Sequence, residues 1–190
     1  MGIRPGRDHG TGLSRGSQRI LGIDPGTVVT GGGIVEMAGS SLIHLAHGTI
    51  GSSANQDQGS RLRRIHRGLQ EVLARHEPEG ISLEKVFFAR NPQSALKLGQ
   101  ARGVALLAAA ESRVAIHEYS SAEIKLAVVG YGQATKEQVQ KMVASLLHLS
   151  GKISGDAADA LAAAICHLHQ SAFHALVSEA APASGRELHR

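Results

Sequence analysis

Cysteine, tryptophan and long apolar runs are what this chain has least of. Among its 190 residues there is one cysteine, Cys166, and no tryptophan. A single thiol can form no disulfide within the chain, so the sequence does not belong to the disulfide-rich secreted class and favours a reducing cytoplasm. We find no run of about 18 apolar residues and no apolar segment near the polar N-terminus, so we expect neither a membrane span nor a signal peptide.

Aromatic side chains are also scarce, while positive charge is in excess. Aromatic residues make up 3% of the chain, so any stacking on nucleic-acid bases would depend on very few of them. The formal net charge is +4 and the pI about 9.6, with much of the excess in residues 1–20 and 61–67. Such a balance is compatible with a polyanionic partner but does not prove one.

The chain is long enough for one domain with its own core. Residues 1–17 are rich in Gly, Arg and Ser without periodicity, which predicts a disordered basic extension. Residues 18–170 carry the periodic patterns of a folded domain. Residues 171–190 are expected to form a loosely ordered C-terminal tail.

The order of elements within residues 18–170 predicts an α/β fold. Short turn signals separate the first three expected strands, which indicates an antiparallel meander. Helical and strand periodicities then follow one another, so we expect a five-stranded mixed sheet flanked by helices. The expected strands are 18–24, 31–37, 42–49, 81–87 and 114–118, and the expected helices are 56–76, 94–110, one capped by Thr135, and 155–170.

Four acidic residues occupy positions that suit metal-dependent phosphoryl chemistry. Asp24 closes the first expected strand, and Glu84 lies in the strand at 81–87. Asp156 and Asp159 are about 60° apart around the start of the last helix, so both can face one point. Asp159 is surrounded by alanine and leucine, and a carboxylate on an apolar helix face needs a partner or a metal. Hard oxygen ligands from separate segments are how proteins hold Mg²⁺.

Each acid taken singly has a plainer explanation. Asp24 begins Asp-Pro-Gly, a common turn, and Glu84 at a strand edge suits a solvated charge. Asp156 suits a helix N-cap. As a group, four neighbouring carboxylates raise one another's pKa and make little sense without a divalent cation. The pattern permits one shared site, but spacing alone does not show that the four residues converge.

A series of segments carries a family resemblance. They are Ile20-Leu-Gly-Ile-Asp-Pro-Gly-Thr, Leu83-Glu-Lys-Val-Phe, Asn91-Pro-Gln-Ser-Ala-Leu-Lys-Leu-Gly-Gln-Ala-Arg-Gly-Val-Ala, Lys125-Leu-Ala-Val-Val-Gly-Tyr-Gly-Gln-Ala-Thr-Lys and Gly155-Asp-Ala-Ala-Asp-Ala-Leu-Ala. Together they resemble RuvC, the bacterial Holliday-junction resolvase family, over about residues 18–170. The block at 94–104 is highly specific, whereas Asp-Pro-Gly alone would not be.

The resemblance implies an RNase H-like fold and a homodimer that cuts four-way junction DNA in recombination and repair. It implies paired symmetric nicks that depend on Mg²⁺, for which Mn²⁺ substitutes, with two ions in each active site. It also implies RuvA and RuvB, the branch-migration machinery, as partners. Catalysis and metal ligation are assigned by the resemblance to Asp24, Glu84, Asp156 and Asp159.

The same resemblance assigns DNA contacts to Lys125, Lys136 and Phe87. Lys136 follows the predicted cap Thr135, where the ammonium group and free helix N–H groups could both reach a phosphate. From the residues alone, both lysines could equally be solvated surface residues. Phe87 and Phe88 point to opposite sides of a strand, so the sequence leaves open which one is exposed for stacking.

Two segments allow more than one structural interpretation. Residues 31–33 are all glycine where the family often has tyrosine at the centre, which predicts a loosened second strand. The Ala-rich segment 94–110 lacks a polar face, so it suits either the core or a dimer interface.

Two other functions compete with the resolvase hypothesis. An actin-like ATPase or sugar kinase shares the Asp-x-Gly-Thr opening, but 190 residues do not readily supply the two lobes of that fold. A catalytically inactive junction-binding protein would need no metal ligands, yet all four acids are present. Both alternatives leave the grouping of the acids unexplained.

Overall fold

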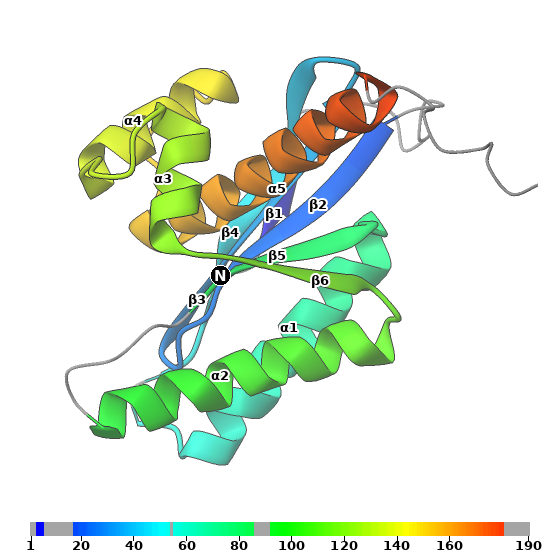
Figure 1. The fold of residues 1–190 in the computed structure, drawn as a ribbon. Helices are drawn as coiled ribbons and strands as arrows, with labels where there is room; N and C mark the ends of the chain where they lie inside the picture. Colours follow the sequence, from blue (N-terminus) through cyan, green and yellow to red (C-terminus); the bar gives the residue numbers. More distant parts are fainter. Residues whose placement is uncertain (1–2, 6–16, 54, 86–91, 181–190) are drawn as a thin grey trace, which may run out of the picture.

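A mixed sheet lies between two layers of helices in the computed structural model, which describes residues 3–5, 17–53, 55–85 and 92–180 (Figure 1). The strand order is β1-β4-β3-β2-β5-β6. The strands are β1 (Arg4–Pro5), β2 (Ser17–Asp24), β3 (Val29–Ala38), β4 (Ser41–Gly51), β5 (Gly80–Glu84) and β6 (Ala115–Tyr119). The helices are α1 (Gln58–His76), α2 (Pro92–Glu111), α3 (Ser121–Val129), α4 (Lys136–Leu146) and α5 (Gly155–Ala180).

The length of each connection between strands matches the direction in which the strands pair. β2, β3 and β4 are antiparallel neighbours joined by short turns, which confirms the predicted meander. β2 pairs with β5, and β5 with β6, in parallel, and α1 and α2 provide the long crossovers that parallel pairing needs. The predicted five-stranded α/β fold is therefore confirmed, with β1 as an additional two-residue edge strand.

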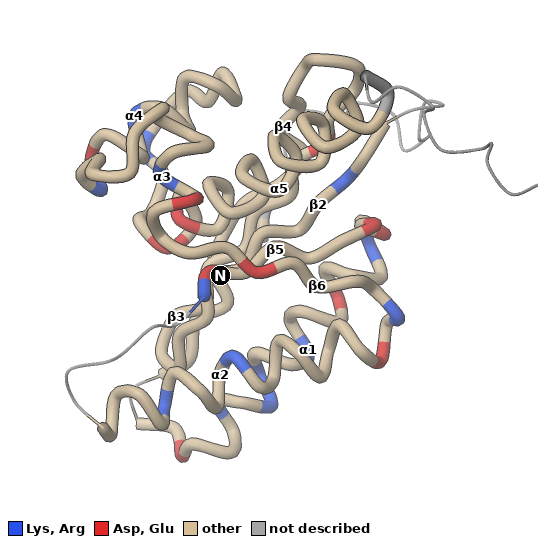
Figure 2. The backbone as a smooth tube through the Cα atoms, viewed as in Figure 1, with Lys and Arg blue, Asp and Glu red and all other residues tan. Residues whose placement is uncertain are grey.

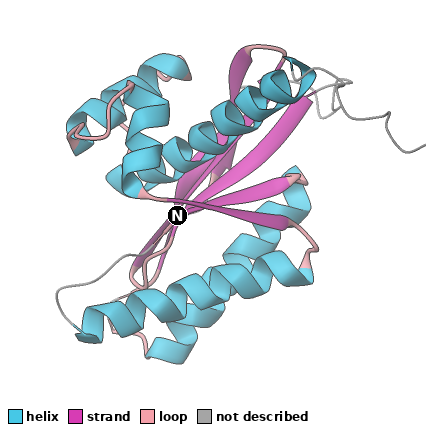
Figure 3. Cartoon of the chain, in the orientation of Figure 1, coloured by secondary structure: helices cyan, strands magenta, loops and turns pink. Residues whose placement is uncertain are grey.

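Helices cover both faces of this sheet, as the layers in Figure 3 show. α1 and α2 pack on one face, and α3, α4 and α5 on the other. On α1 the predicted apolar stripe is confirmed, because Ile65, Leu69 and Val72 are buried. Each face of the sheet therefore carries its own apolar core.

The first residues of the N-terminal segment pack against the sheet, which the sequence does not predict. Residues 4–5 pair with His47 and Ala46 of β4, so this part of the predicted disordered extension is ordered; residues 6–16 lie outside the described residues. The Cδ1 atom of Ile3 lies 2.4 Å from where a Cβ of Gly32 would be. β3 is a continuous, mostly buried strand, so the predicted loosening is wrong; Ile3 packs over the space beside Gly32.

Two helices differ from expectation. α3 was not predicted; its sequence is apolar on most sides and so lacks a clear amphipathic period, but Ser120 and Glu123 form a capping box at its start. α5 continues to Ala180, so the expected end near residue 170 and the loosely ordered tail from 171 are wrong for residues 171–180. From Phe173 to Ser178 this helix is exposed, so the helix continues there without burial against the core.

The first half of α5 is the central helix of the fold. A Cβ at Gly22 would lie 1.8 Å from the carbonyl oxygen of Ala160, so only glycine permits this approach to β2. The Ser82 hydroxyl donates to the carbonyl oxygen of Ala163 at 2.6 Å and ties the helix to β5. By length and composition α5 would also pass for a membrane-spanning helix, and its apolar residues up to Leu168 are buried in the core beside the sheet.

Candidate active site

The two strand acids, Asp24 and Glu84, lie at the same edge of the sheet. Each follows directly after the registered pair Ile23 and Leu83 of the parallel strands β2 and β5. Neighbouring strands are about 4.8 Å apart, so the two carboxylates start from adjacent backbone positions. Side chains alternate between faces, and Ile23 and Leu83 belong to the core under α1 and α2. Asp24 and Glu84 therefore project to the opposite face, which α5 covers.

Gly31 brings the start of α5 to this edge. It is the direct partner of Asp24 across β2 and β3. A Cβ at Gly31 would lie 2.0 Å from the carbonyl oxygen of Asp156, so the backbone of α5 touches the strand beside Asp24. Asp159 follows one turn later on the same helix. The absent side chain at position 31 thus places the helix acids next to the strand acids.

The plainer explanations of Asp24 and Asp156 do not hold. The turn after Asp24 is closed by Thr30, whose hydroxyl donates to the Gly26 carbonyl oxygen at 2.7 Å. At the start of α5 the Ala157 N–H donates to Ser154 Oγ at 3.4 Å, so Ser154 supplies the capping contact. Neither the turn nor the helix end requires its aspartate.

Electrostatics shows that the other three acids act on Asp24. Burial, followed by the charges of Asp159, Asp156 and Glu84 in that order, raises the pKa of Asp24 to about 7, while Lys136 opposes the shift. A buried carboxylate with three acidic neighbours is costly to ionise. A bound cation would remove that cost, since it would neutralise the group and replace its lost water.

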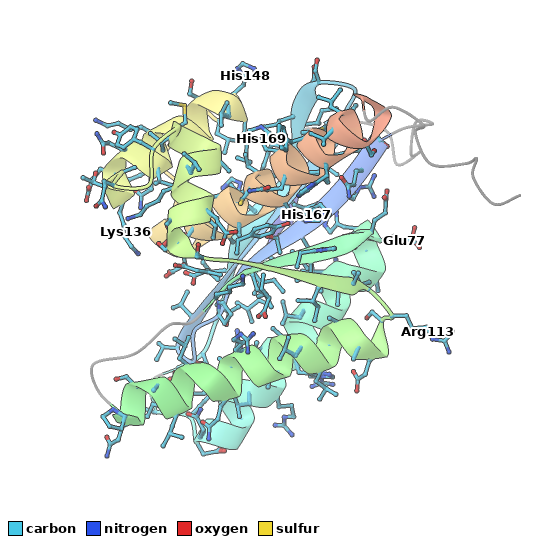
Figure 4. The ribbon with its side chains drawn as sticks, viewed as in Figure 1. Glu77, Arg113, Lys136, His148, His167 and His169 are labelled. Atoms are coloured by element: carbon cyan, nitrogen blue, oxygen red, sulfur yellow. The ribbon has the colours of Figure 1, made fainter. Side chains whose placement is uncertain are left out.

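Lys136 is the cation that the chain itself provides. It is the first residue of α4, and its Nζ donates to Asp159 Oδ2 at 2.9 Å. This hydrogen bond and the acids nearby raise the pKa of Lys136. The lysine side chain is largely exposed, whereas that of Asp159 is mostly buried. Figure 4 shows Lys136 on α4 close to the start of α5.

Among the described residues, no three His, Cys, Asp or Glu side chains are already gathered into a closed metal-ligand set. Asp159 is instead paired with Lys136. The number and type of oxygen donors still suit a hard divalent ion.

The other predicted DNA contacts are placed less directly. Lys125 lies half-buried on α3, on the same side of the sheet as the acids, and is not among the charges that act on Asp24. Phe87 lies outside the described residues, as does Phe88. Gly31 is a site residue that the sequence motifs do not predict. Its signal is the Gly-Gly-Gly run at residues 31–33, which by itself predicts a loosened strand.

Known proteins match this chain in sequence and in structure. The model of the family described as "Crossover junction endodeoxyribonuclease RuvC" matches residues 20–167. The protein of that name from Pelobacter propionicus is 51% identical over 165 residues, 87% of this chain and 92% of the relative. That from Geobacter metallireducens is 49% identical over 153 residues, 80% of this chain and 93% of the relative.

The solved structure of Thermus thermophilus RuvC in complex with Holliday junction substrate has a TM-score of 0.79 to this structure at 34% identity. It covers 83% of this chain and 96% of that one. This agreement confirms the RNase H-like fold and leaves no place for a two-lobed actin-like kinase. By sequence and by structure, over most of its length, the chain belongs to the RuvC family of crossover junction endodeoxyribonucleases.

Proposed function

We propose that this protein resolves four-way Holliday junctions in homologous recombination and repair by paired symmetric nicks. The observation that carries the proposal is the convergence of four carboxylates around Asp24, whose pKa of about 7 reflects burial beside three other acids. Family membership supports branched DNA as the substrate, because the structure of the related Thermus thermophilus protein was solved in complex with Holliday junction DNA.

Membership of this nuclease family implies use of a divalent metal. We propose Mg²⁺, with Mn²⁺ as a substitute and two ions in each site, held by Asp24, Glu84, Asp156 and Asp159. When bound, such ions activate water as the nucleophile and stabilise the leaving 3′ oxygen. Asp24 has the central role, since all the other acids act on it.

The chain's own residues position the scissile phosphate in this proposal. The Lys136 ammonium group leaves Asp159 and pairs with a phosphate oxygen, at the N-terminus of α4 where the helix dipole favours an anion. The capping box of Thr135 and Gln138 fixes that helix end. Lys125 is proposed to contact the junction DNA, and Phe87 to stack on it, on the strength of family membership.

The active form is proposed to be a homodimer. Leu96 and Leu107 of α2 are 70% and 51% exposed, and an exposed leucine pair on an Ala-rich helix suits contact with a second copy. A two-fold dimer presents two active sites, which matches two symmetric nicks. RuvA and RuvB as partners, and the cytoplasm as the compartment, complete the proposal on the basis of the family.

One assay tests the function. Wild-type protein, Asp24→Asn and Asp159→Asn are given Mg²⁺ with a mobile four-way junction or a linear duplex. Asparagine preserves shape and removes the charge that a hard cation requires. We expect wild-type protein to make paired nicks in the junction and none in the linear duplex. In both variants the rate of cutting should fall by at least about 100-fold, which is the effect of removing one key interaction with the transition state.

Glu79→Gln is the matched control, since Glu79 is exposed just before β5 begins, at the other end of that strand from Glu84. It should cut like wild type. Equal cutting of linear duplex, or full activity in either asparagine variant, would refute the proposal.

A further inference from the structure

A groove along α1 contains a group of arginines that the active site does not use. Its volume is about 640 Å³. Figure 2 shows Lys and Arg positions along α1 in blue. We call it the arginine groove after its four arginines, Arg63, Arg64, Arg67 and Arg75.

None of these arginines forms an ion pair within the described part of the chain. All four are exposed. Glu71 is the one acidic residue that lines the groove. Arg19 behaves differently, because it is buried and paired with Glu36 at 2.8 Å. The groove arginines are therefore available to an external anion.

The arginines are held on a rigid support. Positions 63, 67, 71 and 75 recur every four residues, so they form one row along α1 that spans about 18 Å. Gly68 lets α1 approach β4 closely, since its Cβ would lie 2.8 Å from Ile50 Cδ1. Ile50 and Val72 contribute an apolar lining to the groove. The charges line a hollow that could hold a ligand.

The groove extends from the edge of the sheet that carries the active site. Gly51, at the end of β4, pairs with Val29, at the start of β3, just after the turn that follows Asp24. Gln56 and Ser60 line the end of the groove that follows β4, and His76 lines the far end. α1 lies on the face of the sheet opposite α5 (Figure 1). A strand that leaves the cleavage centre around this edge would meet the arginine groove.

We propose that the arginine groove binds the phosphate backbone of a duplex arm of the junction as that arm leaves the cleavage centre. The inference rests on the proposed function for its substrate. Arginine's planar fork suits phosphate oxygens, and each phosphate contact releases condensed counterions. Contacts of this kind orient the duplex without reading its sequence.

The experiment compares junctions with arms of about one helical turn and of about three turns, some 10 bp per turn. Metal-free binding is measured by fluorescence anisotropy over a range of salt concentrations. The test protein is the triple variant Arg63→Gln, Arg67→Gln, Arg75→Gln, because glutamine matches arginine in helix propensity. We expect roughly 10-fold weaker binding of the long-armed junction and a salt slope smaller by about 2 to 3.

Glu71→Gln is the matched control of opposite sign. Removal of the groove's acid should tighten binding of the long-armed junction, which a change that merely damaged the fold would not do. Binding of the short-armed junction, and its cutting at saturating enzyme with Mg²⁺, should be unchanged in both variants. If the triple variant does not fold, Arg75→Gln alone must weaken, and Glu71→Gln must tighten, binding of the long arms.

The inference would be overturned if the triple variant bound the long-armed junction as tightly as wild type, or if its affinity fell equally for both junctions. Unchanged affinity for the long-armed junction would point to a protein partner for the arginine groove instead. Failure of the proposed function looks different. In that case wild-type protein would not cut even the short-armed junction.

Discussion

Asp24 combines burial with three acidic neighbours, and its ionisation works against the fold. The pKa of its carboxyl is about 7 in the folded chain against 3.8 for an ordinary aspartate. Between these values the folded state holds a proton that the unfolded state has released, so stability falls as pH rises from about 4 to 7. Above pH 7 the full penalty applies until a cation binds.

Asp24→Asn should therefore stabilise the metal-free protein at pH 8. The three-unit shift sets an upper limit of about 4 kcal/mol, and screening by solvent reduces the expected gain to about 1–3 kcal/mol. Thermal unfolding in EDTA should show a rise in Tm at pH 8 that vanishes towards pH 4. A variant that is less stable than wild type at pH 8 would contradict the pKa of Asp24.

Lys136 pairs with Asp159 and is proposed to contact DNA, and a substitution should separate these two effects. Lys136→Gln frees Asp159 from its ion pair and removes a positive charge beside Asp24. Affinity for Mn²⁺ should rise several-fold, since a single neighbouring charge acts at the scale of about one kcal/mol. Affinity for the junction should fall.

Titration calorimetry with Mn²⁺ and anisotropy with a labelled junction measure these two changes. Lys141→Gln, further along α4, is the control and should leave Mn²⁺ affinity unchanged. A fall in both affinities for Lys136→Gln would mean that the lysine only supports the local structure.

Among the elements, α5 determines the geometry of the site, because it carries two acids to a sheet that carries two others. Its approach depends on glycines in the facing strands. Gly22 and Gly31 leave room for the backbone at Ala160 and Asp156. Any side chain at these positions would move the helix away from the strands.

Gly31→Ala should displace the start of α5 and separate Asp156 from Asp24. We expect a loss of roughly 1–3 kcal/mol in unfolding free energy, typical of overpacking, together with a large loss of junction cutting. Gly51→Ala is the control, because nothing lies within 4 Å of a Cβ at that strand position. Similar activity in the two variants would show that the close approach is unnecessary.

At the scale of the whole molecule, two linked cuts require two linked active sites. Leu96→Glu combined with Leu107→Glu places charges on the proposed dimer face of α2. Sedimentation should show a monomer, and cutting should change from paired nicks to slow single nicks. Leu126→Glu on α3, where the leucine is 56% exposed, should leave the dimer intact. A dimer that survives the double substitution would place the interface elsewhere.

Local pattern was sufficient for much of the fold. Short turns predicted the meander, and the apolar stripe predicted α1. It failed for α3, which has no amphipathic period, and for the last ten residues of α5, where residues 173–178 are exposed. Neither failure touches the acids, because these lie in elements whose sequence signals were clear.

The amino-acid sequence by itself determined which residues are available for metal and phosphate, since carboxylates and lysines are chosen locally. Tertiary structure alone decided that they share one place. β2 and β5 align Asp24 with Glu84, and Gly31 admits the backbone of Asp156. The physical reason is that the fold brings like charges together at the cost of their mutual repulsion, and the raised pKa of Asp24 reflects that cost together with burial. No spacing along a chain contains that information.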